Sequence, residues 1–429
     1  MVSAVLFISL VVFLVISLPI GVSIGMAALS TIGLCAPISN ETFVQSMMQG
    51  LNSFPLMAVP LFTFAGEVMG KGGISARLIN AAKVVSGRCT GGLGIVTIIT
   101  SLFFAAIAGT GSAAVAAIGI IMIPTMVRHG YDKGYASALV ATAGTVGVII
   151  PPSVCMVVYA VAAGASINGL FMAGVVPGLV IGLGLILYAY FSSRKNGYRG
   201  DEKRYTGREI LKIFLDAVPG LLIPVIILGG IYGGHFTPTE AAAVAGVYGV
   251  FIGVLVYKEI KWSDLFHIMY RSVLLCAPVL IIIDLSTGFG RILTIAQVPS
   301  QIAEAILSLT SNKYLVLLLI NVLLLIVGTF METNAAIIIL TPILLPIVTA
   351  MGVDPIHFGV IVVMNLSIGF ITPPLGANLF MACQVGSISF DNLVKKIWPW
   401  IIVMIVLLLL VTYVEGISMA LPRALGLVT

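Results

Sequence analysis

Two glycine- and hydroxyl-rich stretches interrupt the apolar sequence of the first half of the chain. One covers residues 109–112 (GTGS), and the other covers residues 147–153 (GVIIPPS). Glycine and proline disfavour regular helix, so each stretch leaves backbone amides and carbonyls without helical partners. In lipid such groups are tolerated only where they are buried in protein or line a cavity. Paired breaks of this kind indicate a transport site.

The same pair of breaks recurs in the second half, in the same order. Residues 328–334 (GTFMETN) correspond to the first break, and residues 369–376 (GFITPPLG) correspond to the second. Four residue pairs register the two halves at an offset of about 220 residues: Pro19 with Pro238, Pro55 with Pro278, Gly109 with Gly328, and Pro151 with Pro373. This pattern predicts an internal repeat.

The chemistry expected at such breaks is ion binding. Exposed carbonyls and hydroxyl oxygens bind a cation, whereas helix N-termini attract an anion. We therefore predict two sodium sites, one in each repeat, between a hairpin tip and a broken helix. The alternative is proline kinks and small-residue packing, which would be less expected to recur twice in one order. The predicted sodium-site residues are Gly109, Thr110, Gly111, Ser112, Gly147, Ile150 and Pro151, with Gly328, Thr329, Glu332, Thr333, Gly369, Ile371, Thr372 and Pro373.

Polar side chains beside the breaks are candidates for a substrate pocket. Asn378 lies four residues after Pro374, and a packing role is an equal alternative for this amide. Thr142 and Thr145, just before the break at residues 147–153, could instead cap or join helices. Glu332 could ligate a cation, carry a proton or fix the hairpin by hydrogen bonds. The predicted substrate-site residues are Ser112, Thr142, Thr145, Ser153, Asn334 and Asn378.

The composition requires a membrane to surround these sites. Of the 429 residues, 60% are hydrophobic and only 9% are charged, against about 25% charged in soluble proteins. Apolar runs of about 20 residues predict an all-α polytopic membrane protein. The net charge of +5 lies in short loops, so topology explains it better than nucleic-acid binding does. The four histidines share no metal-ligand spacing, so sodium is the only metal ion expected.

An enzyme is a weaker interpretation of the same residues. Ser112 could be an intramembrane nucleophile, but such chemistry needs a base. His129 is expected at the opposite end of the hairpin arm. The chain also lacks the phosphate-binding pattern GxxxxGK[ST], so it does not power itself by nucleotide hydrolysis.

The apolar runs divide the chain into two repeats around one hydrophilic linker. Residues 1–191 form the first repeat, with a hairpin at 93–127 and a broken helix at 134–163. Residues 192–216 form a cytoplasmic linker, and residues 217–429 form the second repeat. In that repeat the hairpin is expected at 314–350 and the broken helix at 357–385. Each hairpin is expected to consist of two half-depth helices.

Basic residues predict that the two repeats are inverted relative to each other. The loop before the first hairpin holds Lys71, Arg77, Lys83 and Arg88, whereas residues 294–313 hold only Lys313. By the positive-inside rule the first hairpin enters from the cytoplasm and the second from the periplasm. Both termini are then periplasmic.

Together these motifs resemble the large membrane subunit, of the DctM or SiaM type, of a tripartite ATP-independent periplasmic (TRAP) transporter. The carrying segments are residues 52–56, 109–115, 147–153, 237–242 and 371–376. The resemblance implies sodium coupling, an elevator mechanism, and location in the bacterial inner membrane. It also implies a separate small four-helix membrane subunit and a periplasmic substrate-binding protein.

The substrate implied by the resemblance is an organic acid, such as a C4-dicarboxylate or sialic acid. The sequence shows no cluster of arginines, which favours a monocarboxylate such as sialic acid. The alternative function is a standalone secondary anion antiporter or ion pump with the same inverted architecture.

Overall fold

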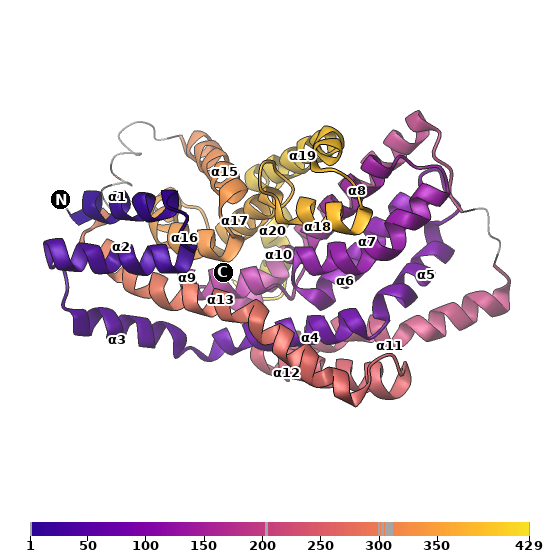
Figure 1. The fold of residues 1–429 in the computed structure, drawn as a ribbon, viewed down its shortest axis with the longest axis horizontal. Coiled ribbons are helices and arrows are strands. Elements are labelled where there is room, and N and C mark those ends of the chain that lie inside the picture. Colours follow the sequence, from indigo (N-terminus) through magenta and orange to yellow (C-terminus); the bar gives the residue numbers. More distant parts are fainter. Residues whose placement is uncertain (1, 202–204, 299–300, 302–303, 305–311, 429) are drawn as a thin grey trace.

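The computed structural model describes residues 2–201, 205–298, 301, 304 and 312–428, and their regular elements are helices (Figure 1). In the first half these are α1 (Val2–Val15), α2 (Ile20–Cys35), α3 (Asn40–Leu51), α4 (Ala58–Lys71), α5 (Ile74–Ser86), α6 (Gly92–Ala108), α7 (Gly111–Arg128), α8 (Lys133–Thr145), α9 (Val154–Ala163) and α10 (Ile167–Asn196). In the second half they are α11 (Gly207–Tyr232), α12 (Pro238–Phe251), α13 (Trp262–Ile295), α15 (Lys313–Phe330), α16 (Thr333–Ala350), α17 (Pro355–Gly369), α18 (Ala377–Gly386), α19 (Phe390–Tyr413) and α20 (Gly416–Ala424).

Within the described residues, eight helices are long and apolar enough to cross a membrane. This confirms the predicted class, an all-α polytopic membrane protein. Several other helices, including α1, α2, α9 and α17, are apolar but shorter than 18 residues. Short apolar helices next to non-helical interruptions fit the prediction that some membrane spans are discontinuous.

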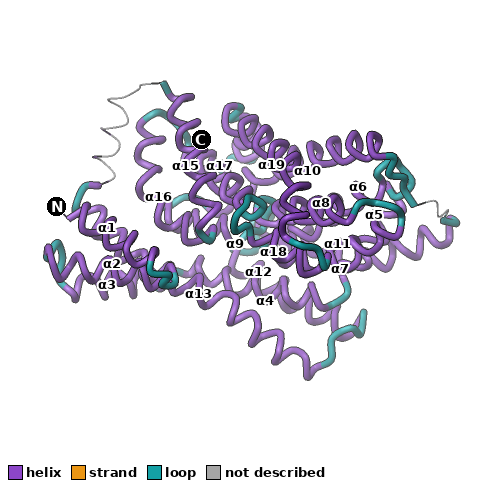
Figure 2. The backbone as a smooth tube through the Cα atoms, turned by 45° about the horizontal axis from the view of Figure 1, so that its top comes forward, coloured by secondary structure: helices purple, strands orange, loops and turns teal. Residues whose placement is uncertain are grey.

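The helices form two packed groups, and each group takes helices from both halves of the sequence (Figures 1 and 2). The outer layer consists of α1–α4 and α11–α13, where α12 packs on α4 and α13 packs on α2, α3 and α4. The inner body consists of α6–α10 and α15–α20. The two groups meet where α4 contacts α6 and α9 and where α13 contacts α16. Neither half of the sequence therefore forms a separate compact unit.

The predicted first hairpin is present as α6 and α7, which pack against each other. The chain reverses at Gly109, whose φ of +62° is the left-handed conformation that glycine adopts readily. The arms contain 17 and 18 residues, which corresponds to about 26 Å each. The arms have the lengths that the predicted run of residues 93–127 implies, and each is nearly as long as the bilayer core is thick, about 30 Å.

The second hairpin is also present, but its break lies later in the sequence than expected. Gly328 and Thr329 belong to the last turn of α15, and Thr333 begins α16. Only Met331 and Glu332 leave the helical conformation. The glycine that marked this break in the sequence thus lies beside the tip and not in it.

Both predicted broken helices are present. The first consists of α8, the short 3-10 helix η2 (Val146–Val148) and α9, and it is broken at residues 149–153. The second consists of α17 and α18, broken at residues 370–376. Both proline pairs have cis peptide bonds. The two halves therefore share the order of hairpin and broken helix.

One pair of segments departs from the expected correspondence. We expected an interfacial segment at residues 258–270 followed by a separate span, but residues 262–295 form the single helix α13. Pro278 lies inside that helix, whereas its counterpart Pro55 lies in the 3-10 helix η1 (Phe54–Met57). There the chain bends by 57° between α3 and the helix that follows. The same residue type therefore breaks one helix and is accommodated in the other.

The hydrophilic segment 192–216 is helical at both ends, since α10 runs to Asn196 and α11 begins at Gly207. Its first irregular residues dock on the inner body. Gly91 donates a backbone hydrogen bond to the Tyr198 carbonyl at 3.1 Å, and the Tyr198 ring stacks on Tyr131 at 4.4 Å. Residues 202–204 of this segment, and most of residues 299–311 in the loop that we predict to be periplasmic, lie outside the described residues.

Candidate functional site

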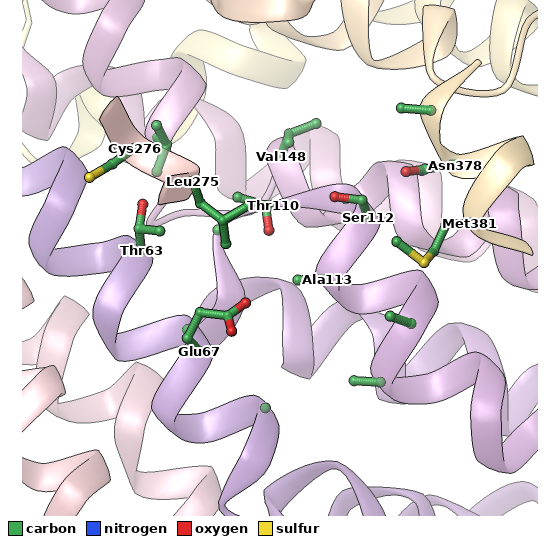
Figure 3. A pocket seen from close by; sticks show the side chains of 18 of the residues that line it. Thr63, Glu67, Thr110, Ser112, Ala113, Val148, Leu275, Cys276, Asn378 and Met381 are labelled. Atoms are coloured by element: carbon green, nitrogen blue, oxygen red, sulfur yellow. The ribbon is translucent and has the colours of Figure 1, made fainter. Parts of the chain in front are cut away.

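A cavity of about 430 Å³ lies where the outer layer meets the inner body. One wall is formed by α4 and α13, through Thr63, Glu67, Arg271 and Cys276 among others. The other wall is formed by both hairpin tips and by the second helix break. Figure 3 shows Thr110 and Ser112 of the first tip with Asn378 of α18. The cavity thus brings together segments that are more than two hundred residues apart in the sequence, including Thr110, Ser112, Glu332, Asn334, Phe370 and Asn378.

The first tip presents the start of α7 to the cavity. Thr110 is the N-cap residue, but its side chain does not cap the helix, and Gly111, Ser112 and Ala113 line the cavity. Figure 3 shows Thr110, Ser112 and Ala113 along this wall. An uncapped helix start carries partial positive charge and outward-pointing amides, which suit a negatively charged ligand group.

Asn378 packs against this helix start. A Cβ on Gly111 would lie 3.2 Å from both the Oδ1 and Nδ2 atoms of Asn378, which is tighter than ordinary van der Waals contact. The Asn378 amide donates a hydrogen bond to the Ala141 carbonyl at 3.1 Å. Its Oδ1 atom is buried without a hydrogen-bond partner. A buried amide oxygen without a partner is an available ligand for a cation or a donor group.

A second helix start without a side-chain cap, that of α18, lies at the same cavity, although the backbone N–H of Asn378 is already bonded to the Phe370 carbonyl. Its N-cap residue is Gly376, which has no side chain to cap with, and Ala377 and Asn378 line the cavity. The other two helices that begin at a tip or break are capped, α9 by Ser153 and α16 by Glu332. The two uncapped starts come from different halves of the sequence.

Glu332 fixes the second tip by hydrogen bonds. Its carboxylate accepts one bond from the Ala335 amide at 3.0 Å and another from the Asn334 side chain at 2.8 Å. Among the roles considered for Glu332, the structure therefore places it as the N-cap of α16. The Thr333 Oγ1 and Asn334 Oδ1 atoms beside it are buried without partners. These oxygens are of the kind that sodium prefers.

Each tip packs against the break of its own half. A Cβ on Gly147 would lie 3.1 Å from the Thr110 carbonyl oxygen, and a Cβ on Gly369 would overlap the Gly328 carbonyl oxygen. Part of the backbone at the second break is hydrogen-bonded within the break itself. The backbone N–H of Asn378 donates to the Phe370 carbonyl at 3.0 Å. Fewer carbonyls are therefore free there than the two prolines suggested.

The predicted site residues fall into two groups. Among the described residues, Ile150, Pro151, Thr329, Ile371, Thr372 and Pro373 lie outside the cavity lining, as do Gly147, Gly328, Thr333 and Gly369 at the tip–break contacts. The predicted site residues that line the cavity are Gly109, Thr110, Gly111, Ser112, Glu332, Asn334 and Asn378.

Three predicted substrate-site residues also lie away from the cavity. Thr142, Thr145 and Ser153 are fully buried. Their hydroxyls donate to backbone carbonyls three to five residues earlier in the chain, at 2.9, 2.7 and 2.6 Å. The structure therefore does not bring them into the described lining.

The sequence analysis missed the charged residues of the outer-layer wall. Arg271 lines the cavity and its Nε atom lies 3.5 Å from the Glu67 carboxylate on α4. Arg271 was missed because the sequence pattern placed it at the boundary of a separate interfacial segment. An isolated carboxylate such as Glu67 within an apolar run was the available signal, since intramembrane charges usually have a partner.

The protease interpretation finds no support in this geometry. Ser112 lies in the first turn of α7, and His129 caps its C-terminus, where the ring Nδ1 contacts the Thr125 carbonyl at 2.8 Å. Seventeen residues of helix separate them by about 25 Å. His129 therefore cannot serve as the base for Ser112.

Comparison with known proteins identifies the family. Residues 7–417 match the model of the DctM component of tripartite ATP-independent periplasmic transporters. The chain is 48% identical, over 95% of its length, to the isethionate TRAP transporter permease protein DctMQ of Oleidesulfovibrio alaskensis, and it spans 64% of that relative's length. It is 41% identical to the C4-dicarboxylate TRAP transporter large permease protein DctM of Pseudomonas aeruginosa, covering 94% of this chain and 95% of the relative.

Two further comparisons bear on the substrate range and on the fold. The sialic acid TRAP transporter large permease protein SiaM of Vibrio cholerae is 37% identical, with 95% of each chain covered. The YdaH transporter of Alcanivorax borkumensis has a similar structure, with a TM-score of 0.66 at 14% identity over 89% of this chain and 90% of that chain. These relatives are transporter permeases and not enzymes. From the family match and these identities, the chain belongs to the DctM component family of tripartite ATP-independent periplasmic transporters.

Proposed function

We propose that this chain is the large permease subunit of a sodium-coupled importer of small organic acids in the bacterial inner membrane. One observation carries the proposal: both hairpin tips and the second helix break line a single cavity, and the uncapped start of α7 faces it. Such a cavity suits an anion, because helix N-termini stabilise negative charge where water is scarce.

The substrate's acidic group would bind at the start of α7. The amides of its first turn and the Ser112 hydroxyl can donate hydrogen bonds, and the Asn378 side chain closes that end of the cavity. A carboxylate and a sulfonate both fit this description. The names of the relatives cover both, since they include C4-dicarboxylates, sialic acid and isethionate.

Sodium would bind beside the cavity, where each tip meets the break of its own half. In the second half the available oxygens are Thr333 Oγ1 and Asn334 Oδ1, which are buried without partners. In the first half the Thr110 carbonyl lies against Gly147. Sodium bound there would hold the tips in place, and substrate affinity would depend on sodium through that coupling.

Alternating access would follow from movement of the inner body against the outer layer. The cavity lies at the boundary between these two groups, so sliding of one group past the other would carry a bound anion along the wall of α4 and α13. This elevator model includes inverted repeats and periplasmic termini. It is supported by the repeated order of hairpin and broken helix in the two halves.

The family description names a tripartite assembly. We propose that a small four-helix membrane subunit and a periplasmic binding protein complete it, and that the binding protein delivers the organic acid. The exposed apolar side chains of α1, α2 and α13 provide surface for lipid and for the small subunit.

The test is uptake into proteoliposomes that contain this chain with the proposed small subunit. Radiolabelled succinate, isethionate or sialic acid is supplied with the matching binding protein, in sodium or in potassium medium. The proposal predicts uptake that requires both sodium and the binding protein. Uptake that needs neither would instead support the alternative, a standalone antiporter or ion pump.

The alternative keeps the same fold, since the antimetabolite efflux pump MtrF of Neisseria gonorrhoeae has a similar structure, with a TM-score of 0.62 at 12% identity. That likeness concerns the fold alone. The cavity of this chain does not separate import from export, so the requirement for a binding protein is the discriminating observation.

A further inference from the structure

An ion pair inside the cavity has no part in the proposal above. The Arg271 Nε atom on α13 lies 3.5 Å from the Glu67 Oε2 atom on α4, and both residues line the cavity. The Glu67 side chain is only 15% exposed, whereas that of Arg271 is 57% exposed. Figure 3 shows Glu67 on the outer-layer wall beneath Thr63. The guanidinium is therefore accessible while its counter-ion is largely buried.

Two other charged residues of the lining, Glu332 and Lys71, have different surroundings. Glu332 uses its carboxylate to cap α16 and to bind Asn334. Lys71 lies one turn after Glu67 on α4 and also lines the cavity. Arg271 thus lines the cavity with a single, slightly long ionic contact to Glu67. The five donors of a guanidinium match the geometry of a carboxylate, so a substrate carboxylate can compete with Glu67 for Arg271.

Arg271 lies on a different wall of the cavity from the starts of α7 and α18. Arg271 belongs to the outer layer, whereas Ser112 and Asn378 belong to the inner body on the other wall. A substrate with acidic groups at both ends can bridge these walls. A substrate with one acidic group can use only one of them at a time.

We propose that Arg271 is a specificity-determining residue that binds the second acidic group of a small dicarboxylate, and that Glu67 holds Arg271 until the substrate displaces it. This inference rests on the proposed function, because it takes the first acidic group to bind at the start of α7. The Glu67 carboxylate imitates the substrate's carboxylate in the empty cavity. Binding is then an exchange of one carboxylate for another, so the charge of Arg271 is neutralised throughout.

The first test replaces the arginine. The Arg271→Gln variant is compared with wild type for the half-saturating concentrations of succinate and of isethionate, which carries one acidic group. Binding is measured as stabilisation of the purified full chain against heat. Loss of one charge-assisted hydrogen-bonding partner predicts about tenfold weaker succinate binding. Isethionate binding should weaken by less than about threefold, because the site at the start of α7 remains intact.

The second test replaces the competing carboxylate. Glu67→Gln removes the competitor and its repulsion of the incoming anion, so succinate binding should tighten by about threefold or more. In the Arg271→Gln background the same change should have a much smaller effect, because the two side chains act through each other. Arg271→Lys keeps the charge and should recover part of the loss.

The matched control is the ion pair between Arg77 and Glu259, whose atoms lie 3.0 Å apart and which lies outside the described cavity lining. Arg77→Gln and Glu259→Gln should leave both half-saturating concentrations unchanged. The unfolding temperature of each variant without anion reports any general destabilisation. Equal effects of the control variants would show that loss of any such pair acts through folding, and would overturn the inference.

The remaining outcomes separate the inference from the proposed function. Unchanged succinate binding in Arg271→Gln overturns the inference, whether or not wild type shows sodium-dependent uptake. Equal losses for succinate and isethionate overturn the two-ended arrangement. Wild type that binds succinate through Arg271 but fails to transport it would refute the proposed function and leave the binding site in place. Wild type that binds neither anion refutes both.

Discussion

Gly369 packs directly against the carbonyl oxygen of Gly328, so that the second broken helix and the second hairpin meet backbone to backbone at this point. Gly147 and Thr110 make the corresponding contact in the first half, with more room. At both glycines a Cβ would meet main-chain atoms of the hairpin. The spacing between hairpin and broken helix therefore depends on the absence of a side chain at Gly147 and Gly369.

This contact predicts the effect of adding one methyl group. Gly369→Ala should destabilise the protein by about 1–3 kcal/mol, because its Cβ would overlap the Gly328 carbonyl and force the backbone apart. Sodium-dependent uptake should be lost. Gly147→Ala should be milder, since its Cβ would lie 3.1 Å from the nearest oxygen. Thermal unfolding and uptake measure the two effects.

The control for these variants is Gly229→Ala on α11, where a Cβ would meet nothing within 4 Å. Alanine there should be neutral or slightly stabilising. If Gly369→Ala kept wild-type stability and uptake, the contact between Gly369 and Gly328 would not be needed for folding or transport.

Asn378 supports a prediction about charge. Asn378→Asp keeps the shape of the side chain but places a carboxylate beside the start of α7, where the substrate's acidic group is proposed to bind. Succinate and isethionate should both bind at least about tenfold more weakly, through like-charge repulsion. Competition binding with the purified protein measures this.

Asn378→Ala separates charge from packing. It removes the hydrogen bond to the Ala141 carbonyl, so stability should fall by about 1 kcal/mol, with a smaller loss of anion affinity than in Asn378→Asp. If Asn378→Asp bound both anions as tightly as wild type, the acidic group would not bind at the start of α7.

Glu332 allows its capping role to be tested against a role as sodium ligand. Glu332→Gln retains a side-chain oxygen that can accept from the Ala335 amide, whereas Glu332→Ala loses the cap and should cost about 1 kcal/mol of stability. If capping is the main role, the glutamine variant keeps the half-saturating sodium concentration of wild type. A large rise in that concentration for Glu332→Gln would instead make the carboxylate charge part of the cation site.

The inverted arrangement can be tested by labelling from each side of the membrane. Cys89 is exposed in the loop before α6, and Gln297 is exposed after α13. One variant keeps Cys89 as its only cysteine, and a second carries Gln297→Cys in a cysteine-free chain. In intact spheroplasts an impermeant maleimide should label position 297 and not Cys89. Labelling of both positions from one side would end the inverted-repeat model.

The sequence predicted much of the fold because its strongest signals are local. Apolar runs, the glycine-rich tip at Gly109 and the two proline pairs act on their own segments, and hairpins and broken helices occur where those signals lie. The lengths of the first hairpin's arms follow from the apolar run at residues 93–127, whereas composition does not set their depth in the bilayer. The separate segment at residues 258–270 was wrong, since tertiary packing of α13 against α2, α3 and α4 keeps one helix continuous through Pro278.

The sequence by itself determined that this is a helical membrane transporter with two tips and two breaks, because solvation of the backbone in lipid constrains each segment separately. Only the tertiary structure decided which of these residues share a cavity. It brought Ser112, Glu332 and Asn378 together, kept Thr142, Thr145 and Ser153 away from the lining, and added Arg271 with its partner Glu67. The direction of each side chain depends on how the outer layer packs against the inner body. No single stretch of sequence encodes that packing, because each group contains helices from both halves of the chain.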